Sequence, residues 1–388
     1  MILTYKYKLS VRKNQYEKLE QILEEQRQLY NAALQERIDC YKKTGKSISY
    51  YDQCKSLTEW RASDTDASNT PIRMQRWTIK QVDLAFAGFF RRQKIKGVKA
   101  GFPRFRGYGR YKSFGFNEFV GITFNDARLH FKGMPKGLKV HLHRELPKNC
   151  DIKSCTIKRD TKGWSVYLQI DIRCRHKRLS NRSTGIDVGI NHLATLSNGE
   201  YISNIKIAKH AKRKLRIKQR ALSRCKKNSK RRQKIRCKVS QFHLKIKNTR
   251  RTYLHQVSKK IISNYDLIAV EKLNIKGLSQ SRLAYSVHDA SWGILNQMLC
   301  YKASKAGAQC IEVDPKYTSQ DCSECGYRVI KSLCERIHNC PSCGLVLDRD
   351  VNAARNILHR AVCSPESINA VQWNKRRIRN DPSNLASD

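Results

Sequence analysis

The sequence predicts a multi-domain α+β protein: a small β-barrel with an inserted helical domain, then an α/β domain that carries a four-cysteine insert. Three observations predict this class. Residues 116–175 alternate apolar and polar side chains as half-buried strands do, residues 182–360 mix strand-like and helix-like segments, and two CxxC pairs interrupt that second region. At roughly 150 residues per domain, a chain of 388 residues is long enough for two or three domains.

The barrel is predicted from two segments that are separated in the sequence. Residues 1–10 alternate apolar and polar side chains, which indicates a strand rather than the core of a signal peptide. Residues 11–115, between the first strand and the strand-rich region that begins at 116, are predicted to form a helical domain. Apolar side chains recur there at three- and four-residue spacing around 19–38 and 77–90. We therefore expect a β-barrel of residues 1–10 and 116–177 with helices inserted into it.

A loop near the end of the helical domain, residues 101–106 (GFPRFR), interleaves basic and aromatic side chains. This mixture suits phosphate contact combined with base stacking. The alternative is a loop whose Phe side chains only anchor it to the core. The sequence leaves both interpretations open.

The second region is predicted to be an α/β domain of residues 182–317 and 348–360, with an insert at 318–347 and a basic tail at 361–388. Its expected elements, in order, are strands at 185–190, 193–196 and 201–203 with a turn at 198–199, a long helical hairpin at 206–260, a strand at 266–270 that ends at Glu271, a helix at 292–306, a strand at 309–313 and a helix at 350–359.

Charge identifies the class of partner. The chain has 78 Lys and Arg against 32 Asp and Glu, a formal net charge of +46. Such a field attracts polyanions, and nucleic acid is the expected one. Residues 201–265 contain no Asp or Glu, so a merely solvated helix face is the weaker interpretation of the hairpin. A membrane surface is also weaker, because no basic amphipathic helix with a bulky apolar face stands out.

The compartment is predicted from what the sequence lacks. There is no run of 18 apolar residues and no export signal, and most of the 15 cysteines are scattered singly. We therefore expect no membrane span and a reducing, cytoplasmic location in a bacterium or archaeon.

Four cysteines form the strongest motif. Cys322 and Cys325 make one CxxC pair, Cys340 and Cys343 make the next, 14 residues lie between them, and a glycine follows each pair. Four thiolates from two such knuckles make a closed tetrahedral site, so we expect one structural Zn²⁺. The alternatives are disulfides, or a site that uses Cys334 or His338.

Three carboxylates stand out in predicted elements: Asp187 lies within the apolar strand 185–190, Glu271 ends another apolar strand, and Asp350 begins the last helix. Taken singly, they are a turn former, a surface residue and a helix cap. Taken together, the element order matches RNase H-like connectivity, in which three carboxylates meet at one edge of a mixed sheet. Such a cluster holds two divalent ions for phosphodiester chemistry, and oxygen ligands favour Mg²⁺, with Mn²⁺ as a substitute.

Four sequence segments resemble one family. They are GIDVG at 185–189, VEKL at 270–273, SQDCSECG at 319–326 and DRDVNAARNI at 348–357, with GFPRF at 101–105 as a further match. The chain is similar to the TnpB (OrfB) proteins of bacterial and archaeal insertion sequences, which are relatives of compact type V CRISPR effectors. The resemblance covers residues 1–360 and does not extend to the tail.

The resemblance implies an RNA-guided DNA endonuclease with a wedge-like β-barrel, a helical recognition domain, a RuvC nuclease domain and a zinc-finger insert. Its partners would be a guide RNA and double-stranded target DNA. The family's catalytic, magnesium-binding acids fall on Asp187, Glu271 and Asp350, with Asp348 as the rival for the third place. Two other functions stay open: a transposase that joins DNA strands without a guide, and a non-catalytic nucleic-acid-binding accessory protein.

Overall fold

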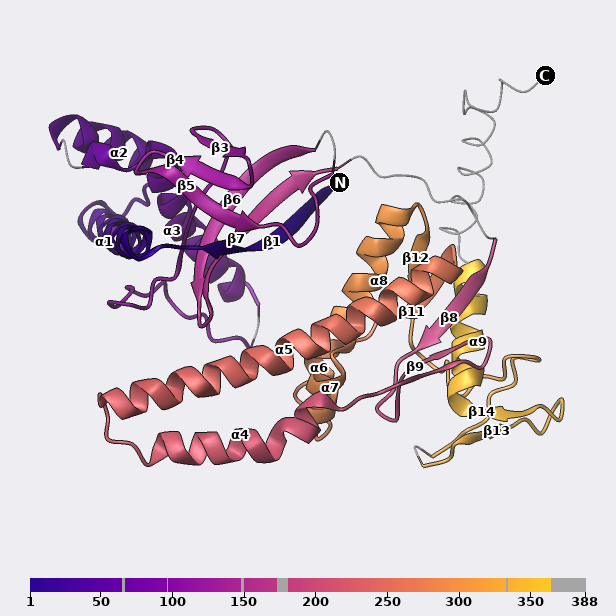
Figure 1. Cartoon of the computed structure of the whole chain (residues 1–388). Coiled ribbons are helices and arrows are strands. Elements are labelled where there is room, and N and C mark those ends of the chain that lie inside the picture. The colour runs from indigo at the N-terminus through magenta and orange to yellow at the C-terminus, as the bar shows by residue number, and fades with distance from the viewer. Residues whose placement is uncertain (65–66, 96, 148–149, 173–180, 333, 364–388) are drawn as a thin grey trace, which may run out of the picture. The chain divides into compact units, whose positions relative to one another are not determined.

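The computed structural model describes residues 1–64, 67–95, 97–147, 150–172, 181–332 and 334–363 (Figure 1). The chain divides into two compact units, Met1–Arg173 and Cys174–Asp388. The predicted basic tail, 361–388, lies outside the described residues from residue 364 onward. In the part of the chain that is described, no helix has the length and apolar character needed to cross a membrane.

The first unit begins with a strand, continues with helices and ends with six further strands in the described ranges. Its elements are β1 (Ile2–Ser10), α1 (Lys13–Thr44), α2 (Tyr50–Ser63), the short 3-10 helix η1 (Ala67–Asn69), α3 (Ile72–Gln93), β2 (Ser113–Phe116), β3 (Ile122–Asn125), β4 (Arg128–Phe131), β5 (Met134–His141), β6 (Asp151–Asp160) and β7 (Gly163–Asp171). The predicted strand at 1–10 and helices around 19–38 and 77–90 are confirmed, and α2 is an additional helix.

These strands form one sheet in the order β2-β6-β7-β1-β5-β4-β3. The first strand of the chain is central: β1 pairs antiparallel with β7 along Ile2 to Lys8 and with β5 along Lys8 to Ser10. The predicted closed barrel is wrong, because β2 and β3 end the strand order and do not pair with each other in the described residues. Alternation in a sequence shows which face of a strand is buried, but it does not show whether the first and last strands meet.

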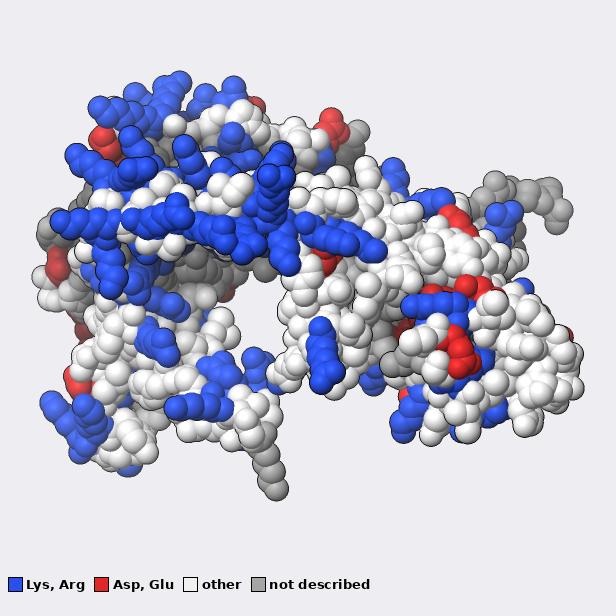
Figure 2. Space-filling view, turned by 90° about the horizontal axis from the view of Figure 1, so that it is seen from below, with Lys and Arg blue, Asp and Glu red and all other residues white. Residues whose placement is uncertain are grey.

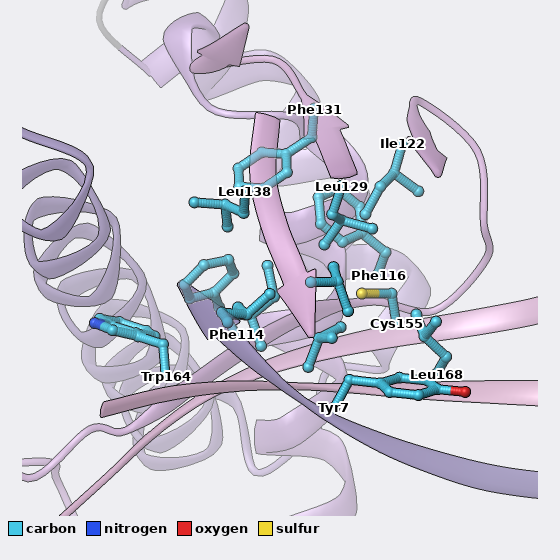
Figure 3. Packing of buried hydrophobic residues seen from close by; sticks show 14 of the residues in the cluster. Tyr7, Phe114, Phe116, Ile122, Leu129, Phe131, Leu138, Cys155, Trp164 and Leu168 are labelled. Atoms are coloured by element: carbon cyan, nitrogen blue, oxygen red, sulfur yellow. The ribbon is translucent and has the colours of Figure 1, made fainter. Parts of the chain in front are cut away.

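One face of this sheet carries the core of the first unit, where aromatic side chains pack together (Figure 3). Trp164 of β7 and Phe114 of β2 have ring centroids 6.3 Å apart, and Phe116 lies 5.8 Å from Phe131 of β4. Leu19 of α1 belongs to the same buried cluster. The helices inserted between β1 and β2 therefore pack on the sheet that their insertion interrupts.

The second unit follows the predicted order of strands and helices, with two short helices and two short strands that were not predicted. Its elements are β8 (Ser183–Asp187), β9 (His192–Leu196), β10 (Tyr201–Ser203), α4 (Ile207–Ser223), α5 (Lys230–Asn264), β11 (Leu267–Glu271), α6 (Ile275–Leu278), α7 (Ala284–Ala290), α8 (Trp292–Ala306), β12 (Gln309–Val313), β13 (Ile337–Asn339), β14 (Val346–Asp348) and α9 (Arg349–Val362). The first strand ends at Asp187, three residues earlier than the 185–190 segment predicts.

Five strands of the second unit form a mixed sheet in the order β10-β9-β8-β11-β12. The central strand β11 pairs parallel with both β8 and β12, whereas β9 and β10 run antiparallel to their neighbours. Ile268 and Val270 pack in a cluster with residues of α5 and α8, and Ala269 packs with Ile357 of α9 on the other face. Burial on both faces explains why β11 is apolar at consecutive positions. The helices α5 and α8 cover one face of the sheet, and α9 covers the other (Figure 1).

Candidate active site and metal centre

The three carboxylates that the sequence singled out lie around one edge of the mixed sheet. Asp187 is the last residue of β8 and Glu271 the last of β11. The two strands are parallel neighbours, with Ile186 opposite Val270, so both side chains leave the sheet at the same edge. Asp350 lies in the first turn of α9, the helix that packs on β8.

A glycine allows α9 to come this close to the strand. A Cβ atom at Gly185 would lie 2.0 Å from the carbonyl oxygen of Ala354 and 2.7 Å from the backbone nitrogen of Leu358. Any larger residue would push the helix away from β8. Gly185 thus sets the helix–strand distance that brings Asp350 to Asp187, a role that the sequence motif alone does not reveal.

Asp187 is influenced electrostatically by both of the other carboxylates. The pKa of Asp187 is raised well above its usual value, first by burial and then by the negative charges of Glu271 and Asp350. Burial also raises the pKa of Glu271, opposed by a hydrogen bond from Thr318 and the charge of Arg360. Three carboxylates that repel one another in a partly dry site fit a divalent cation, which would relieve the repulsion.

The carboxylates of Asp348 and Asp350 make different contacts. The Asp348 carboxylate caps α9, accepting hydrogen bonds from the backbone nitrogens of Asp350 at 2.8 Å and Val351 at 3.2 Å. The proposed cap at Asp350 is therefore wrong, since the cap lies two residues earlier. The Asp350 carboxylate instead lies 3.4 Å from the Arg349 guanidinium and 3.8 Å from that of Arg336.

Sequence reasoning missed the side chains that tie the cysteine insert to the carboxylate edge. Thr318 donates a hydrogen bond of 2.7 Å to Glu271, and both side chains are buried. Asn352 and Asn356 of α9 hold the backbone of the first knuckle, both donating to the Asp321 carbonyl. The available signal was two asparagines spaced i, i+4 on an otherwise apolar helix face, because an amide buried there needs partners.

The four predicted cysteines meet in one cluster. The Sγ atoms of Cys322, Cys325, Cys340 and Cys343 all lie within 4.8 Å of one another. Two of the separations, Cys322 to Cys343 and Cys325 to Cys340, are 3.6 Å. A tetrahedral Zn²⁺ with Zn–S bonds of about 2.3 Å requires sulfur separations of about 3.8 Å, so the cluster fits one zinc ion.

The alternatives for the cysteine site do not match this geometry. All four cysteines are free thiols rather than disulfides. Cys334 is exposed and His338 is buried, and neither belongs to the group of candidate ligands. The ring of His338 instead contacts the Lys331 ammonium. A four-cysteine metal site is therefore the arrangement that the structure supports.

The acid-free segment forms the predicted helical hairpin, with α4 and α5 side by side (Figure 1). No residue of α4 is buried. The hairpin is closed at its tip by Arg232, which donates to the carbonyls of Leu222 and Cys225 at 3.0 Å. At its base, the Asp289 carboxylate accepts from the backbone of α4 and from Arg250. The hairpin is thus held at both ends while its basic side chains face solvent.

Lys and Arg side chains cover much of the face shown in Figure 2, and acidic side chains are few there. In the loop at 101–106, the two Phe side chains differ: one anchors the loop, as one interpretation expected, and the other is exposed. Phe102 packs edge-on against Phe89 at 5.3 Å and acts as an anchor, whereas Phe105 is 52% exposed. Arg106 is held by Asn31 through its backbone and lies over the ring of Tyr30.

Three protein-family models match parts of the chain. The OrfB_IS605 family model, described as "Probable transposase", matches residues 165–282. A "Cas12f1-like, TNB domain" model matches 292–357, which includes the cysteine cluster and most of α9. A "Helix-turn-helix domain" model of the same OrfB group matches 1–46, where the structure has β1 followed by the single long helix α1.

Relatives align over nearly the whole chain. A "Putative RNA-guided DNA endonuclease" of Streptomyces pristinaespiralis is 29% identical over 93% of this chain and 90% of its own length. InsQ of Escherichia coli K12, named in the same way, is 27% identical over 92% of this chain and 91% of its own length. The CRISPR-associated endodeoxyribonuclease Cas12f1 of Sulfoacidibacillus thermotolerans is 36% identical over 31% of this chain and 29% of its own.

Among solved structures, the Cas12f1 chain of a Cas12f1–sgRNA–target DNA complex shares the fold with a TM-score of 0.56 and 16% identity. The match covers 92% of this chain and 84% of that one. The family resemblance expected from the four sequence segments is confirmed. The chain carries matches to two OrfB_IS605 family models, at residues 1–46 and 165–282, and it aligns over nearly its whole length with relatives named RNA-guided DNA endonucleases.

Proposed function

We propose that this protein is a transposon-encoded, RNA-guided DNA endonuclease that requires magnesium. The proposal is supported by the position of Asp187, Glu271 and Asp350 around one edge of the mixed sheet, where the charges of the other two raise the pKa of Asp187. The names of its full-length relatives, which describe RNA-guided DNA endonucleases, support the choice of substrate and guide.

The second unit would act as an RNase H-like (RuvC) nuclease domain formed by residues 182–317 and 348–360. Two Mg²⁺ ions bound by the three carboxylates would activate water and stabilise the leaving oxygen of a phosphodiester. The protein's own part is to position the ligands: β8 and β11 fix Asp187 and Glu271, and α9 fixes Asp350. Arg349 contacts Asp350 and lowers the pKa of Asp187, so it moderates the repulsion among the carboxylates.

The other parts of the chain would hold nucleic acid. We propose that residues 1–10 and 116–177 act as the wedge, 11–115 as the recognition domain, and the α4–α5 hairpin as a phosphate-binding arm. Base pairing with the guide would supply sequence specificity, while Lys and Arg contact the backbones of guide RNA and double-stranded DNA. The insert at 318–347 would bind one structural Zn²⁺ through its four cysteines.

Strand transfer is the second candidate function, because the OrfB_IS605 model is described as a transposase. RNase H-like carboxylate sites can serve that reaction as well. The two functions differ in their need for RNA: a strand-transferring enzyme acts on transposon ends without a guide. Cleavage that survives removal of all co-purifying RNA would therefore favour the transposase.

The decisive experiment compares carboxylate variants of the full chain, purified with the RNA that it carries and assayed for DNA cleavage in Mg²⁺. Asp187→Ala and Asp350→Ala are expected to abolish cleavage while RNA binding survives. Glu324→Ala, at an exposed carboxylate of the knuckle, is the matched control and should cleave normally. Cleavage retained by Asp187→Ala would refute the proposed site and leave a non-catalytic nucleic-acid-binding protein.

The same assay separates the two aspartates of the DRD segment. Asp348→Ala should lower stability by about 1 kcal/mol through loss of the α9 cap but retain cleavage. If Asp348→Ala abolished cleavage and Asp350→Ala did not, the third ligand would be Asp348.

A further inference from the structure

We infer that Thr318 is a positioning residue for Glu271, and that it links the cysteine knuckle to the metal-binding edge. The inference rests on the proposed function, because it assumes that Glu271 is a metal ligand. Its basis is a set of buried hydrogen bonds connecting β11, the knuckle and α9.

The first link joins the knuckle to the carboxylate. The Thr318 hydroxyl donates to Oε1 of Glu271 at 2.7 Å, and the two residues are 4% and 8% exposed. A hydrogen bond to one oxygen fixes the rotation of a carboxylate about its last bond, so the position of the other oxygen is fixed as well. This bond also stabilises the charged form, opposing the burial that raises the pKa of Glu271.

The second link joins Thr318 to α9. The amide nitrogen of Asn356 donates to the Thr318 carbonyl at 2.8 Å and to the Asp321 carbonyl at 2.6 Å. One turn earlier, Asn352 donates to the Asp321 carbonyl at 2.8 Å and accepts from the Ser323 backbone at 2.9 Å. The helix that carries Asp350 therefore also fixes the loop that orients Glu271.

The third link is to the cysteine cluster. Cys322 is buried and follows Asp321 directly, so the loop that holds Thr318 continues into the first cysteine ligand. Arg360 reinforces the loop from α9 by donating to the Asp314 and Lys316 carbonyls and to the Asp321 carboxylate. Loss of order at the cysteines would thus reach Glu271 through a short, fully hydrogen-bonded path.

The role goes beyond ordinary packing because the donor acts on a proposed ligand. Groups that hydrogen-bond to metal-ligating carboxylates set ligand orientation, and their loss typically lowers metal affinity by about 10- to 100-fold. A purely structural Thr318 would affect stability instead, and a valine of the same shape would leave metal affinity unchanged.

The test measures Mn²⁺ binding by isothermal titration calorimetry to the full chain freed of nucleic acid, without any cleavage reaction. Thr318→Val is expected to bind Mn²⁺ about 10- to 100-fold more weakly than the natural chain. Thr318→Ser restores the hydroxyl and should restore the affinity, with thermal melting and zinc content recorded for each variant. Unchanged Mn²⁺ affinity in a folded Thr318→Val variant would overturn the inference.

Two further variants complete the design. On a Glu271→Ala background, which removes the acceptor, Thr318→Val should cause no additional loss of Mn²⁺ affinity, because Thr318 acts through Glu271; an additional loss would contradict this path. If the valine variant fails to fold, Thr318→Ala removes the same donor without adding a methyl group beside the carboxylate.

Asp187→Ala distinguishes a failure of the proposed active site from a failure of the role assigned to Thr318. If it removes Mn²⁺ binding while Thr318→Val does not, the proposed active site stands and the role of Thr318 is refuted. If Asp187→Ala leaves Mn²⁺ binding intact, the proposed site fails and the inference fails with it.

Discussion

The second unit holds two regions with strong charge of opposite sign, and they are built in opposite ways. The α4–α5 hairpin has no acidic residue between 201 and 265, and its helix α4 buries nothing. The carboxylate edge is small, and Glu271 within it is buried and hydrogen-bonded. In the hairpin, side chains of the same charge are spread over a solvent-exposed surface, where screening by salt weakens their repulsion. The edge concentrates them where the repulsion is strong.

This difference shows how each region depends on its ligand. The hairpin is held at its tip by Arg232 and at its base by Asp289 of α7, and neither contact involves a bound nucleic acid. At the edge, burial first and then the charges of Glu271 and Asp350 raise the pKa of Asp187, so its charged form is disfavoured without a cation. It is held together by surrounding groups, which are the glycine contact, the asparagine contacts and the cysteine cluster. Variants should therefore affect the edge through stability and the hairpin through affinity.

Loss of the cysteine cluster is expected to give the largest effect. Cys322→Ser removes one of four metal ligands, and structural zinc sites contribute about 10 kcal/mol or more to folding. We expect loss of zinc and a melting temperature lowered by more than about 10 °C. Atomic absorption and calorimetry measure both. Cys334→Ser, at an exposed cysteine outside the cluster, is the control and should match the natural chain.

Gly185→Ala is expected to give the next largest effect, because its Cβ would lie 2.0 Å from the Ala354 carbonyl oxygen. Overpacking of this severity should destabilise the second unit by at least about 3 kcal/mol. Chemical denaturation measures the loss. Gly101→Ala is the control, since a Cβ there meets nothing within 4 Å. Equal stability of the two variants would mean that α9 does not lie this close to β8.

Charge removal on the hairpin should change affinity and leave folding intact. Replacing Arg213, Arg216 and Arg220, all exposed on α4, by Gln removes three charges. Each charge contributes about 0.7 to the slope of log affinity against log salt concentration. Loss of three charges should therefore lower RNA affinity at 0.15 M salt by about 50-fold and reduce the magnitude of that slope by about 2. Filter binding across a salt series tests this. An unchanged slope would show that α4 does not contact phosphate.

The smallest expected effect comes from relieving charge at the edge. The pKa of Asp187 is raised in the folded chain, so its contribution to stability is present at acid pH and is lost as pH rises through the folded pKa. At pH 7 in buffer without added magnesium or manganese, which leaves the structural zinc in place, Asp187→Asn should raise the melting temperature. The expected rise is about 2–4 °C for each kcal/mol of charge repulsion that the substitution removes.

The gain from Asp187→Asn should shrink as the pH is lowered toward 4, where the natural carboxyl is itself protonated. Melting curves across pH measure this trend. A gain that stays constant with pH, or a loss at pH 7, would indicate that Asp187 carries no repulsive charge in the metal-free chain.

Local features of the sequence were enough to predict most elements and the residues of both candidate sites. The apolar run 267–270 predicts a strand buried on both faces, and β11 is one. The two CxxC pairs predict a four-cysteine cluster, and their sulfur atoms meet. Asp187, Glu271 and Asp350 were singled out from their positions at element ends, and in the structure the last two influence the pKa of the first; their roles stay a prediction. These predictions succeed because periodicity and short spacing act within a few residues.

The tertiary structure decided what depends on contacts between distant segments. The seven-stranded sheet stays open because closure requires β2 and β3 to pair, and no local pattern encodes that. Asp348 caps α9 and Asp350 does not, because the helix begins directly after Asp348. The exact residue at which the helix begins decides which carboxylate bonds to the free backbone nitrogens. The bond from Thr318 to Glu271 joins residues 47 positions apart, so it exists only after β11, the knuckle and α9 have packed together.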